Sequence, residues 1–570
     1  MLDSDGLRVA DDRGTLAVDA VATPSAVKAG GAALPAFLLA ACGGGGGDGA
    51  TSGTSSSTTP VTVAPVALSA AQSSRFLGQA TMGATRASID ALVSRGFEGW
   101  LTDQFAMPRA TSHWDWLVKN GFNVTANMNI ETGFDPTMWR QLIAEPDQLR
   151  QRVGMALLDM LVVGIGGVNL SWAQFAMAAY VDVLLDNAFG SFRTLIGAIT
   201  TNAAMASFLT FLNNRKANAN TGAQPDENYA RELMQLFTLG LYQLNMDGSV
   251  KTSGGVPLET YGQADVTGLA RVFTGLQLAS NDNTTPDRMR QPLVMNAGLN
   301  ETGTSTFLGT TVSGGGMAAI NAALDAIVAH PNVPPFVSKQ LIQRLVTSNP
   351  SPAYIQRVAT VFADNGSGVR GDMKAVIRAI LLDSEARGDA ALSSASAGKL
   401  REPVMRLTGW ARAYGVTSPS NAWAIGDTSS PSSRLGQSMG RSPSVFNFFR
   451  PGYAPPDTAI AGAGLVAPEV QITNEQSVVA YVNYMSTLVA NGTGDMKPDY
   501  TALAAKASDS AALVDEVNLV LAAGQLGSDA ITAIRAAVDS IASTATNAAT
   551  LRTQIAILLT LASPEYLTVK

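Results

Sequence analysis

Amphipathic helical patterns recur along the chain from about residue 67 to residue 570. In many windows apolar residues return every three or four positions, the spacing that places them on one face of an α-helix. Four such windows follow one another at 317–330, 334–348, 352–366 and 372–383. Because the joints between them are short, we expect antiparallel neighbouring helices. The pattern predicts an all-α (mainly α) fold, a multi-helix globular bundle with long loops.

Two stretches interrupt the helical pattern. Between Asn245 and Gln263 the residues are rich in turn formers, so we expect at most a small β-hairpin there. Residues 428–456 are rich in Pro and Ser and are expected to form a long loop. We place the main helical domain at 67–496 and a C-terminal helical segment, packed on it, at 497–570.

The composition limits the classes of function. The formal net charge is -7, whereas a protein that binds nucleic acid presents a basic surface to the phosphates. We therefore expect no nucleic-acid partner. Two histidines and one cysteine are too few for a zinc cluster and cannot form an intrachain disulfide. We expect no metal ion and no cofactor.

The single cysteine, Cys42, follows an apolar run and precedes a tract of Gly, Ser and Thr. The small residues before it resemble the lipobox of bacterial lipoproteins, whose cysteine sulfur is acylated. The apolar run at 29–41 is too short to span a bilayer, which takes roughly 20 residues. We expect a leader at 1–41, a flexible tether at 42–66 and a lipid anchor on Cys42.

The start of the leader is unusual, because residues 1–24 contain five aspartates and lack a basic n-region. A start at Val27 places Lys28 before the apolar run, so Val27 is our alternative start. The other interpretation is a cytosolic N-terminus in which Cys42 carries no lipid. Under the lipid-anchor interpretation, we expect the protein in the bacterial envelope, at the outer membrane or the periplasmic face.

The most specific motif is PDENYARELMQLFTLGLYQL at 225–244, accompanied by RFLGQATMGAT, LRQRVGMALLDMLVV, ADVTGLARVFTG, HPNVPPFVSKQLIQRLV, SPSVFNFFRPGY and LASPEY. Together these motifs resemble the domain-of-unknown-function 1800 family over residues 68–570. The resemblance implies an exported, largely helical bacterial protein, often encoded beside an exported sulfatase-like protein, without an established activity. The resemblance also implies that many relatives carry His where this chain has Asn202, Phe237 and Asn300. If those histidines serve chemistry, this member has lost it.

The motif at 225–244 begins with four polar side chains, Glu227, Asn228, Arg231 and Glu232. On a wheel drawn for a continuous α-helix they share one arc, and the opposite arc holds Tyr229, Ala230, Leu233, Phe237 and Leu241. This periodicity favours a solvated face with a Glu227–Arg231 pair, and a buried polar network is the second interpretation. As a functional site, Glu227 and Glu232 would be acid/base groups or cation ligands, and Arg231 an anion clamp. The two carboxylates diverge too far for a close retaining-glycosidase pair.

The loop at 428–456 supplies the other candidate residues. Arg450, Asn447 and Tyr453 lie among aromatic residues that suit a sugar or peptide platform, with core packing as the alternative. The loop also contains GQSMG, which matches the G-x-S-x-G elbow with Ser438 as nucleophile. Because no histidine follows it, we expect no catalysis by Ser438.

Two smaller features have structural interpretations. His330 lies at the end of a helical window, where His commonly interacts with the last carbonyls. The sequence NMDGSV, which contains Asp247, resembles a fragment of a calcium loop but lacks the further acidic positions. We expect a helix end at His330 and a turn at Asp247.

These features predict an exported, lipoprotein-like helical protein that serves as a binding or assembly component of the bacterial envelope. The expected partner is the exported sulfatase-like neighbour, and the lipid anchor provides the contact with the membrane. The alternative is a hydrolase of envelope polysaccharide that uses Glu227, Asn228, Arg231 and Glu232. A deep acidic cleft between the motif at 225–244 and the Arg450 loop favours the enzyme, and a broad apolar surface favours partner binding.

Overall fold

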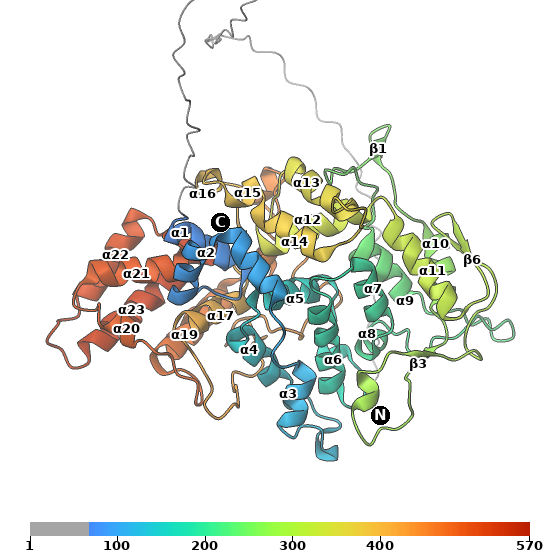
Figure 1. Cartoon of the computed structure of the whole chain (residues 1–570), viewed down its shortest axis with the longest axis horizontal. Coiled ribbons are helices and arrows are strands. Elements are labelled where there is room, and N and C mark those ends of the chain that lie inside the picture. Colours follow the sequence, from blue (N-terminus) through green and yellow to red (C-terminus); the bar gives the residue numbers. More distant parts are fainter. Residues whose placement is uncertain (1–67) are drawn as a thin grey trace, which may run out of the picture. The chain divides into compact units, whose positions relative to one another are not determined.

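The computed structural model describes residues 68–570, which belong to one compact unit, Val66–Lys570 (Figure 1). The described residues form helices α1 to α24 and four two-stranded sheets, so the predicted mainly α fold is confirmed. Short 3₁₀-helices lie at Thr125–Asn127, Ile165–Gly167, Asp287–Met289 and Pro468–Ile472. The predicted leader, the predicted tether up to residue 66, and Cys42 lie outside the described residues.

Among the first eight helices, α5 and α6 form a central pair, and each of the other six packs against one or both of them (Figure 1). Their bounds are α1 Ala70–Ala80, α2 Arg86–Ala106, α3 His113–Lys119, α4 Phe134–Ala144, α5 Gln148–Met160, α6 Ala173–Asp186, α7 Phe192–Thr200 and α8 Ala203–Phe208. Ser69 and Thr85 begin α1 and α2 with capping boxes, which satisfy free backbone donors. Nearly every residue of α5 and α6 is buried, because other helices cover them on all sides.

The middle of the chain carries short helices and most of the β-structure. Its helices are α9 Asn228–Glu232, the π-helix η3 Leu233–Thr238 and α10 Gln263–Val272. Its antiparallel strand pairs are β1 Thr252–Ser253 with β2 Val256–Pro257, β3 Leu276–Gln277 with β4 Val294–Met295, and β5 Ser305–Phe307 with β6 Thr310–Val312. The β1–β2 hairpin is the expected one. The other pairs are new, because strands of two or three residues are too short to show an alternating pattern.

The predicted run of four helices is present. It consists of α11 Gly316–Ala329, α12 Val333–Leu345, α13 Pro352–Ala363 and α14 Met373–Leu382. Pro352 occupies the first turn of α13, where a missing backbone N–H costs no hydrogen bond, and Ser351 caps that helix. α13 packs against both α12 and α14, and α12 also packs against the central helix α5.

The remaining elements include a long loop and the C-terminal helices. They are α15 Ser384–Arg387, α16 Ala390–Ser393, β7 Lys399–Leu400, α17 Pro403–Ala413, α18 Ala459–Gly462, α19 Glu475–Asn491, α20 Thr501–Ala504, α21 Ser510–Ala522, α22 Ser528–Asp539, α23 Ala548–Ala562, α24 Pro564–Leu567 and β8 Thr568–Val569. Residues 428–456 contain no helix or strand. The C-terminal region returns to the start of the described chain, because α21 packs on α1 (Figure 1). At the end of the chain, β8 pairs with β7.

Candidate functional site

The motif at 225–244 forms a short α-helix that continues as a π-helix. α9 ends at Glu232, η3 follows, and the Thr238 hydroxyl donates to the Leu233 carbonyl five residues earlier. Gly240 then turns the chain at a φ of 77°. The wheel for a continuous α-helix is therefore wrong beyond Glu232, and Leu241 lies outside the helix with 49% of its surface exposed. π-Helices are rare and occur frequently at functional sites.

Glu227 connects α9 to α10. Its Oε1 accepts a hydrogen bond from the Thr267 hydroxyl at 2.7 Å, and its Oε2 accepts one from Gln263 Nε2 at 2.7 Å. Arg231 Nη2 donates to the same Oε2 at 3.0 Å, so the predicted i, i+4 pair is present. Burial acts to raise the pKa of Glu227, but the bonds from Thr267 and Gln263 and the charge of Arg231 lower it. Each oxygen of this carboxylate has a partner.

The other two residues of the cluster have different surroundings. Glu232 is 7% exposed, and its Oε2 has no hydrogen-bond partner in the described part of the chain. Burial raises the pKa of Glu232, against the lowering effect of the nearby Arg231 charge. The backbone N–H of Asn228 donates to Asp226 Oδ1 at 2.8 Å at the start of α9. Glu227 and Glu232 therefore share no hydrogen-bond partner.

A cavity of about 610 Å³ lies between the end of η3, the chain that follows it, α12 and the 428–456 loop. This volume is within the range of sites that hold small organic ligands, about 300–1,000 Å³. Its apolar wall includes Leu236, Leu241, Tyr242, Phe336, Ile355, Val445, Phe446, Leu465 and Val466. Its charged lining residues are Asp159, Asp247, Lys339, Arg344 and Arg450. The cavity joins the motif at 225–244 to the Arg450 loop, as a cleft would, but its lining is not acidic.

The candidate binding residues of the loop occupy three different places. Arg450 lines the cavity, and its guanidinium carbon lies 4.7 Å from the centre of the Phe446 ring. Asn447 is buried at a φ of 61° and donates from Nδ2 to Asp159 Oδ1 at 2.8 Å. Tyr453 lies in a turn whose backbone N–H donates to the Arg450 carbonyl at 3.1 Å. Arg450 thus has a cation–π contact within the protein, and the sugar or peptide platform stays a prediction.

Asp159 and Arg344 are the most buried charged residues of the cavity lining, each 4% exposed. Arg344 Nη2 donates to the backbone carbonyl of Asp159 at 2.7 Å, but Arg344 Nε and Asp159 Oδ2 have no partner among the described residues. Burial, and then the charge of Glu402, raise the pKa of Asp159 to about 8. The raised pKa favours the protonated form of Asp159, and with three cations and two aspartates the lining has a net positive charge.

A buried ion cluster supports this part of the lining from behind. Lys399 Nζ lies 2.9 Å from Glu469 Oε1 and 3.4 Å from Glu402 Oε1. The same Nζ donates to the backbone carbonyl of Arg344 at 2.8 Å. Burial acts to raise the pKa of Glu402, but the charges of Lys399 and Arg152 lower it. The cluster thus ties the end of α12 to β7 and to the 3₁₀-helix at Pro468–Ile472.

Asp159, Lys339 and Arg344 were missed in the sequence. Asp159 and Arg344 stand in the apolar stretches LLDML and LIQRLV, and a lone charge in an apolar helix is a signal of a buried polar site. A lone charge does not show which residue it contacts, because Asp159 and Arg344 are far apart in the chain.

The remaining sequence features have structural positions. Ser438 is buried in the loop, which has neither the strand nor the helix of a nucleophile elbow around it. His330 follows α11, and its Nδ1 accepts a hydrogen bond from the Asn332 backbone N–H at 3.1 Å. Asp247 Oδ1 accepts from the Ser249 N–H at 2.9 Å within a turn. These arrangements agree with the expected turn and helix end.

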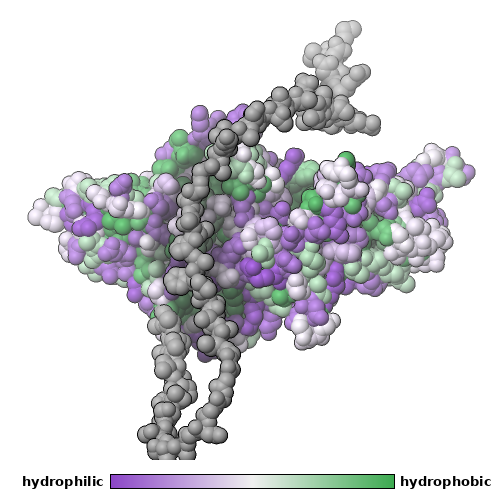
Figure 2. Space-filling view, turned by 90° about the horizontal axis from the view of Figure 1, so that it is seen from above, coloured by the Kyte–Doolittle hydropathy of each residue, from purple (hydrophilic) through white to green (hydrophobic). Residues whose placement is uncertain are grey.

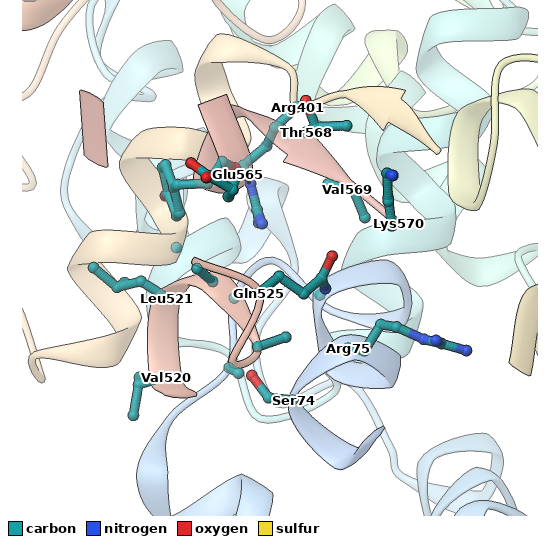
Figure 3. Close-up of a pocket in the computed structure, with 17 residues that line it drawn as sticks. Ser74, Arg75, Arg401, Val520, Leu521, Gln525, Glu565, Thr568, Val569 and Lys570 are labelled. Atoms are coloured by element: carbon teal, nitrogen blue, oxygen red, sulfur yellow. Dashed lines mark hydrogen bonds between the residues drawn. The ribbon is translucent and has the colours of Figure 1, made fainter. Parts of the chain in front are cut away.

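A second, much smaller cavity of about 20 Å³ lies where the C-terminus meets α1 and α21 (Figure 3). Its lining includes Arg75, Gln525, Glu565 and Lys570. This volume admits about one water molecule. It is a packing gap between the ends of the described chain. Another cavity, of about 420 Å³, has among the described residues no Lys or Arg in its lining except Lys570, and the cavity of about 610 Å³ with its charged lining is the candidate site.

The family comparison covers both the motif at 225–244 and the cavity. Residues 75–568 match the family described as Protein of unknown function (DUF1800). The chain belongs to this family. No curated protein and no solved structure matches it.

In this DUF1800 chain, the three positions at which relatives are expected to carry His serve capping and packing. Asn202 Oδ1 accepts from the backbone N–H groups of Ala204 and Met205 at the start of α8. Phe237 is fully buried, and Asn300 Nδ2 donates to the Thr274 carbonyl at 2.7 Å. None of the three lines the 610 Å³ cavity.

Residues 68–570 contain no group of three or more His, Cys, Asp or Glu side chains arranged to hold a metal ion. Within the same range, every helix is too short or too polar to cross a bilayer.

Proposed function

We propose that this DUF1800 protein is an exported, lipid-tethered binding component of the bacterial envelope that holds a small organic ligand in the 610 Å³ cavity. The lipobox-like sequence before Cys42 supports export and anchoring. The family resemblance supports an exported sulfatase-like partner. Binding is favoured over polysaccharide hydrolysis, because Glu227 is fully engaged in joining α9 to α10 and lies outside the cavity.

The cavity is the observation that carries this proposal. Its wall combines aromatic and aliphatic side chains with a few polar groups, the composition of a site for a small organic molecule. On the face drawn in Figure 2, outside the grey atoms, hydrophobic residues form small patches between hydrophilic ones. On that face, such a distribution is typical of a surface without a broad apolar interface.

The cavity can be tested with a neutral apolar fluorophore, N-phenyl-1-naphthylamine, on the Cys42→Ser chain. We expect saturable binding of one fluorophore per chain. Gly452 lines the cavity, and a Cβ at this position meets open space, so Gly452→Trp should block the site without a backbone clash. Gly462 is equally open but lies outside the lining, so Gly462→Trp is the matched control. Equal binding by both variants contradicts the proposal.

Anchoring and partnership need separate tests. Wild-type protein should incorporate labelled palmitate in bacterial membranes, and Cys42→Ser should not. Native protein released from membranes in mild detergent should co-purify with an exported sulfatase-like protein. Unlabelled wild-type protein in the soluble intracellular fraction would contradict the anchor, and recovery without that partner would contradict the partnership.

A further inference from the structure

Three cations line the cavity without a carboxylate partner. Within residues 68–570, the side chains of Lys339, Arg344 and Arg450 have no carboxylate oxygen within 4.0 Å. Arg344 is 4% exposed and its Nε is unpartnered, so a strong hydrogen-bond donor lies unused beside the cavity. Burial lowers the pKa of Lys339, and no neighbouring carboxylate compensates. The charges of Asp159, Glu402 and Glu469 act on Arg344 from beyond ion-pair distance, so the feature that requires an explanation is its buried, unpartnered Nε at the cavity.

We propose that the cavity selects an organic anion with an apolar body, whose carboxylate or phosphate head binds at Arg344, while Lys339 adds a second positive charge to the same lining. This inference rests on the proposed binding function and assigns its ligand class. A guanidinium presents several N–H groups in a planar fork that suits the oxygens of either head group. Arg450, at the exposed end of the lining, attracts the anion as it enters.

The two aspartates of the lining do not oppose this assignment. Asp159 faces Arg344 and, from the elements packed behind it, Glu402 and Lys399. In its protonated form it adds no negative charge, and its unpartnered Oδ2 is available to a ligand. Asp247 is solvated and accepts two hydrogen bonds from Ser249. A bound anion therefore meets the buried cation Arg344, and the Asp247 carboxylate of the lining is solvated and hydrogen-bonded to Ser249.

The apolar part of the ligand follows from the rest of the wall. Leu241, Tyr242, Val250 and Phe446 all line the cavity, yet each is about two-fifths to one-half exposed. Such side chains gain by covering an aliphatic chain, because each buried CH₂ contributes about 0.8 kcal/mol. An anion with a chain of about ten carbons uses both parts of the site.

The experiment compares four ten-carbon probes on the Cys42→Ser chain by calorimetry: decanoate, decyl phosphate, decanol and decyltrimethylammonium. We expect one of the two anions to bind at least tenfold more tightly than decanol, and the tighter anion identifies the head group. Arg344→Met should weaken that anion at least tenfold and leave decanol unchanged. Arg95→Met, which removes a cation that is paired with Asp103 on the surface, is the control and should change neither.

Folding is checked by circular dichroism, and Lys339→Met replaces Arg344→Met if the latter fails to fold. If decanol binds as tightly as the anions, or the cationic probe binds best, the proposed ligand class is wrong. If the anions show no preference but N-phenyl-1-naphthylamine still binds and Gly452→Trp still excludes it, only the proposed ligand class is wrong. Failure of that fluorophore test is the separate sign that the binding function itself is wrong.

Discussion

The cluster on α9 and the charged lining of the cavity are two polar sites with opposite properties. On α9, Glu227 is half-buried and both of its carboxylate oxygens accept hydrogen bonds from α10 or from Arg231. At the cavity, Arg344 and Asp159 are almost fully buried, and each keeps an atom without a partner. A dense group of charges in the sequence can therefore serve to hold two helices together. Isolated charges in apolar helices can build a binding site.

The largest expected effect tests the ion cluster behind the cavity. Lys399→Met removes the cation between Glu402 and Glu469 and leaves two buried carboxylates. Breaking a buried pair by removing one partner typically costs about 3–5 kcal/mol. We expect the free energy of unfolding, measured with urea on the Cys42→Ser chain, to fall by that amount.

A surface lysine provides the matched control. Lys506 lies 3.4 Å from Glu516, and its side chain is 44% exposed. Lys506→Met should lower the free energy of unfolding by less than about 1 kcal/mol. Equal losses in the two variants would show that the ion cluster does not hold the cavity in shape.

The second effect is a pH dependence of anion binding. As the pH rises through about 8, Asp159 ionises and places a negative charge beside the bound head group. The decanoate carboxylate is ionised throughout this range, so repulsion should weaken its binding about tenfold between pH 6.5 and 9.5, or ~1.4 kcal/mol. Calorimetric titrations at several pH values measure this change.

A variant of Asp159 separates its titration from that of Lys339, whose loss of charge at high pH acts in the same direction. Asp159→Asn keeps a polar side chain but cannot ionise, so most of the pH dependence should disappear. An unchanged pH profile in Asp159→Asn would assign the effect to Lys339 and remove Asp159 from the site.

Much of the fold was predictable, because periodic burial of apolar residues is a local property of the chain. The run α11 to α14 and the β1–β2 hairpin were expected at their observed positions. The sheet of β7 with β8 was not, since it joins Lys399 to Val569 and each strand has two residues. Pairing over such a distance depends on tertiary packing, which a local pattern does not record.

The candidate site was predictable only in part. Arg450 was recognised from its aromatic neighbours, and it lines the cavity. Asp159 and Arg344 were not, because one is on α5 and the other on α12, and only folding brings them together. The change from α-helix to π-helix at Leu233 was also missed, since a helical wheel assumes one period throughout.

The third expected effect is a pH dependence of stability that comes from the buried Glu232 carboxyl group of the α9 cluster. Its folded-state pKa is raised, so the folded protein binds more protons than the unfolded chain, and stability falls as the pH rises through the folded value. Glu232→Gln removes the buried carboxylate and should flatten this dependence, with a gain in the free energy of unfolding at pH 8. Urea unfolding of the variant and the wild type from pH 5 to 8 measures the pH dependence and the difference in stability. A parallel pH profile for the variant and wild type would show that Glu232 does not titrate abnormally.

The smallest expected effect is the loss of stability when one hydrogen bond between Glu227 and α10 is removed. Thr267→Val keeps the size of the side chain but removes the hydroxyl that donates to Glu227 Oε1. Because this carboxylate is about one-third exposed and keeps its bonds to Gln263 and Arg231, we expect a loss of about 1 kcal/mol in unfolding free energy. Thr267→Ser retains the hydroxyl and should lose less. Decanoate affinity should stay the same in both variants, since Thr267 lies outside the cavity lining. A tenfold change in that affinity would show that the α9 cluster and the cavity act as one site.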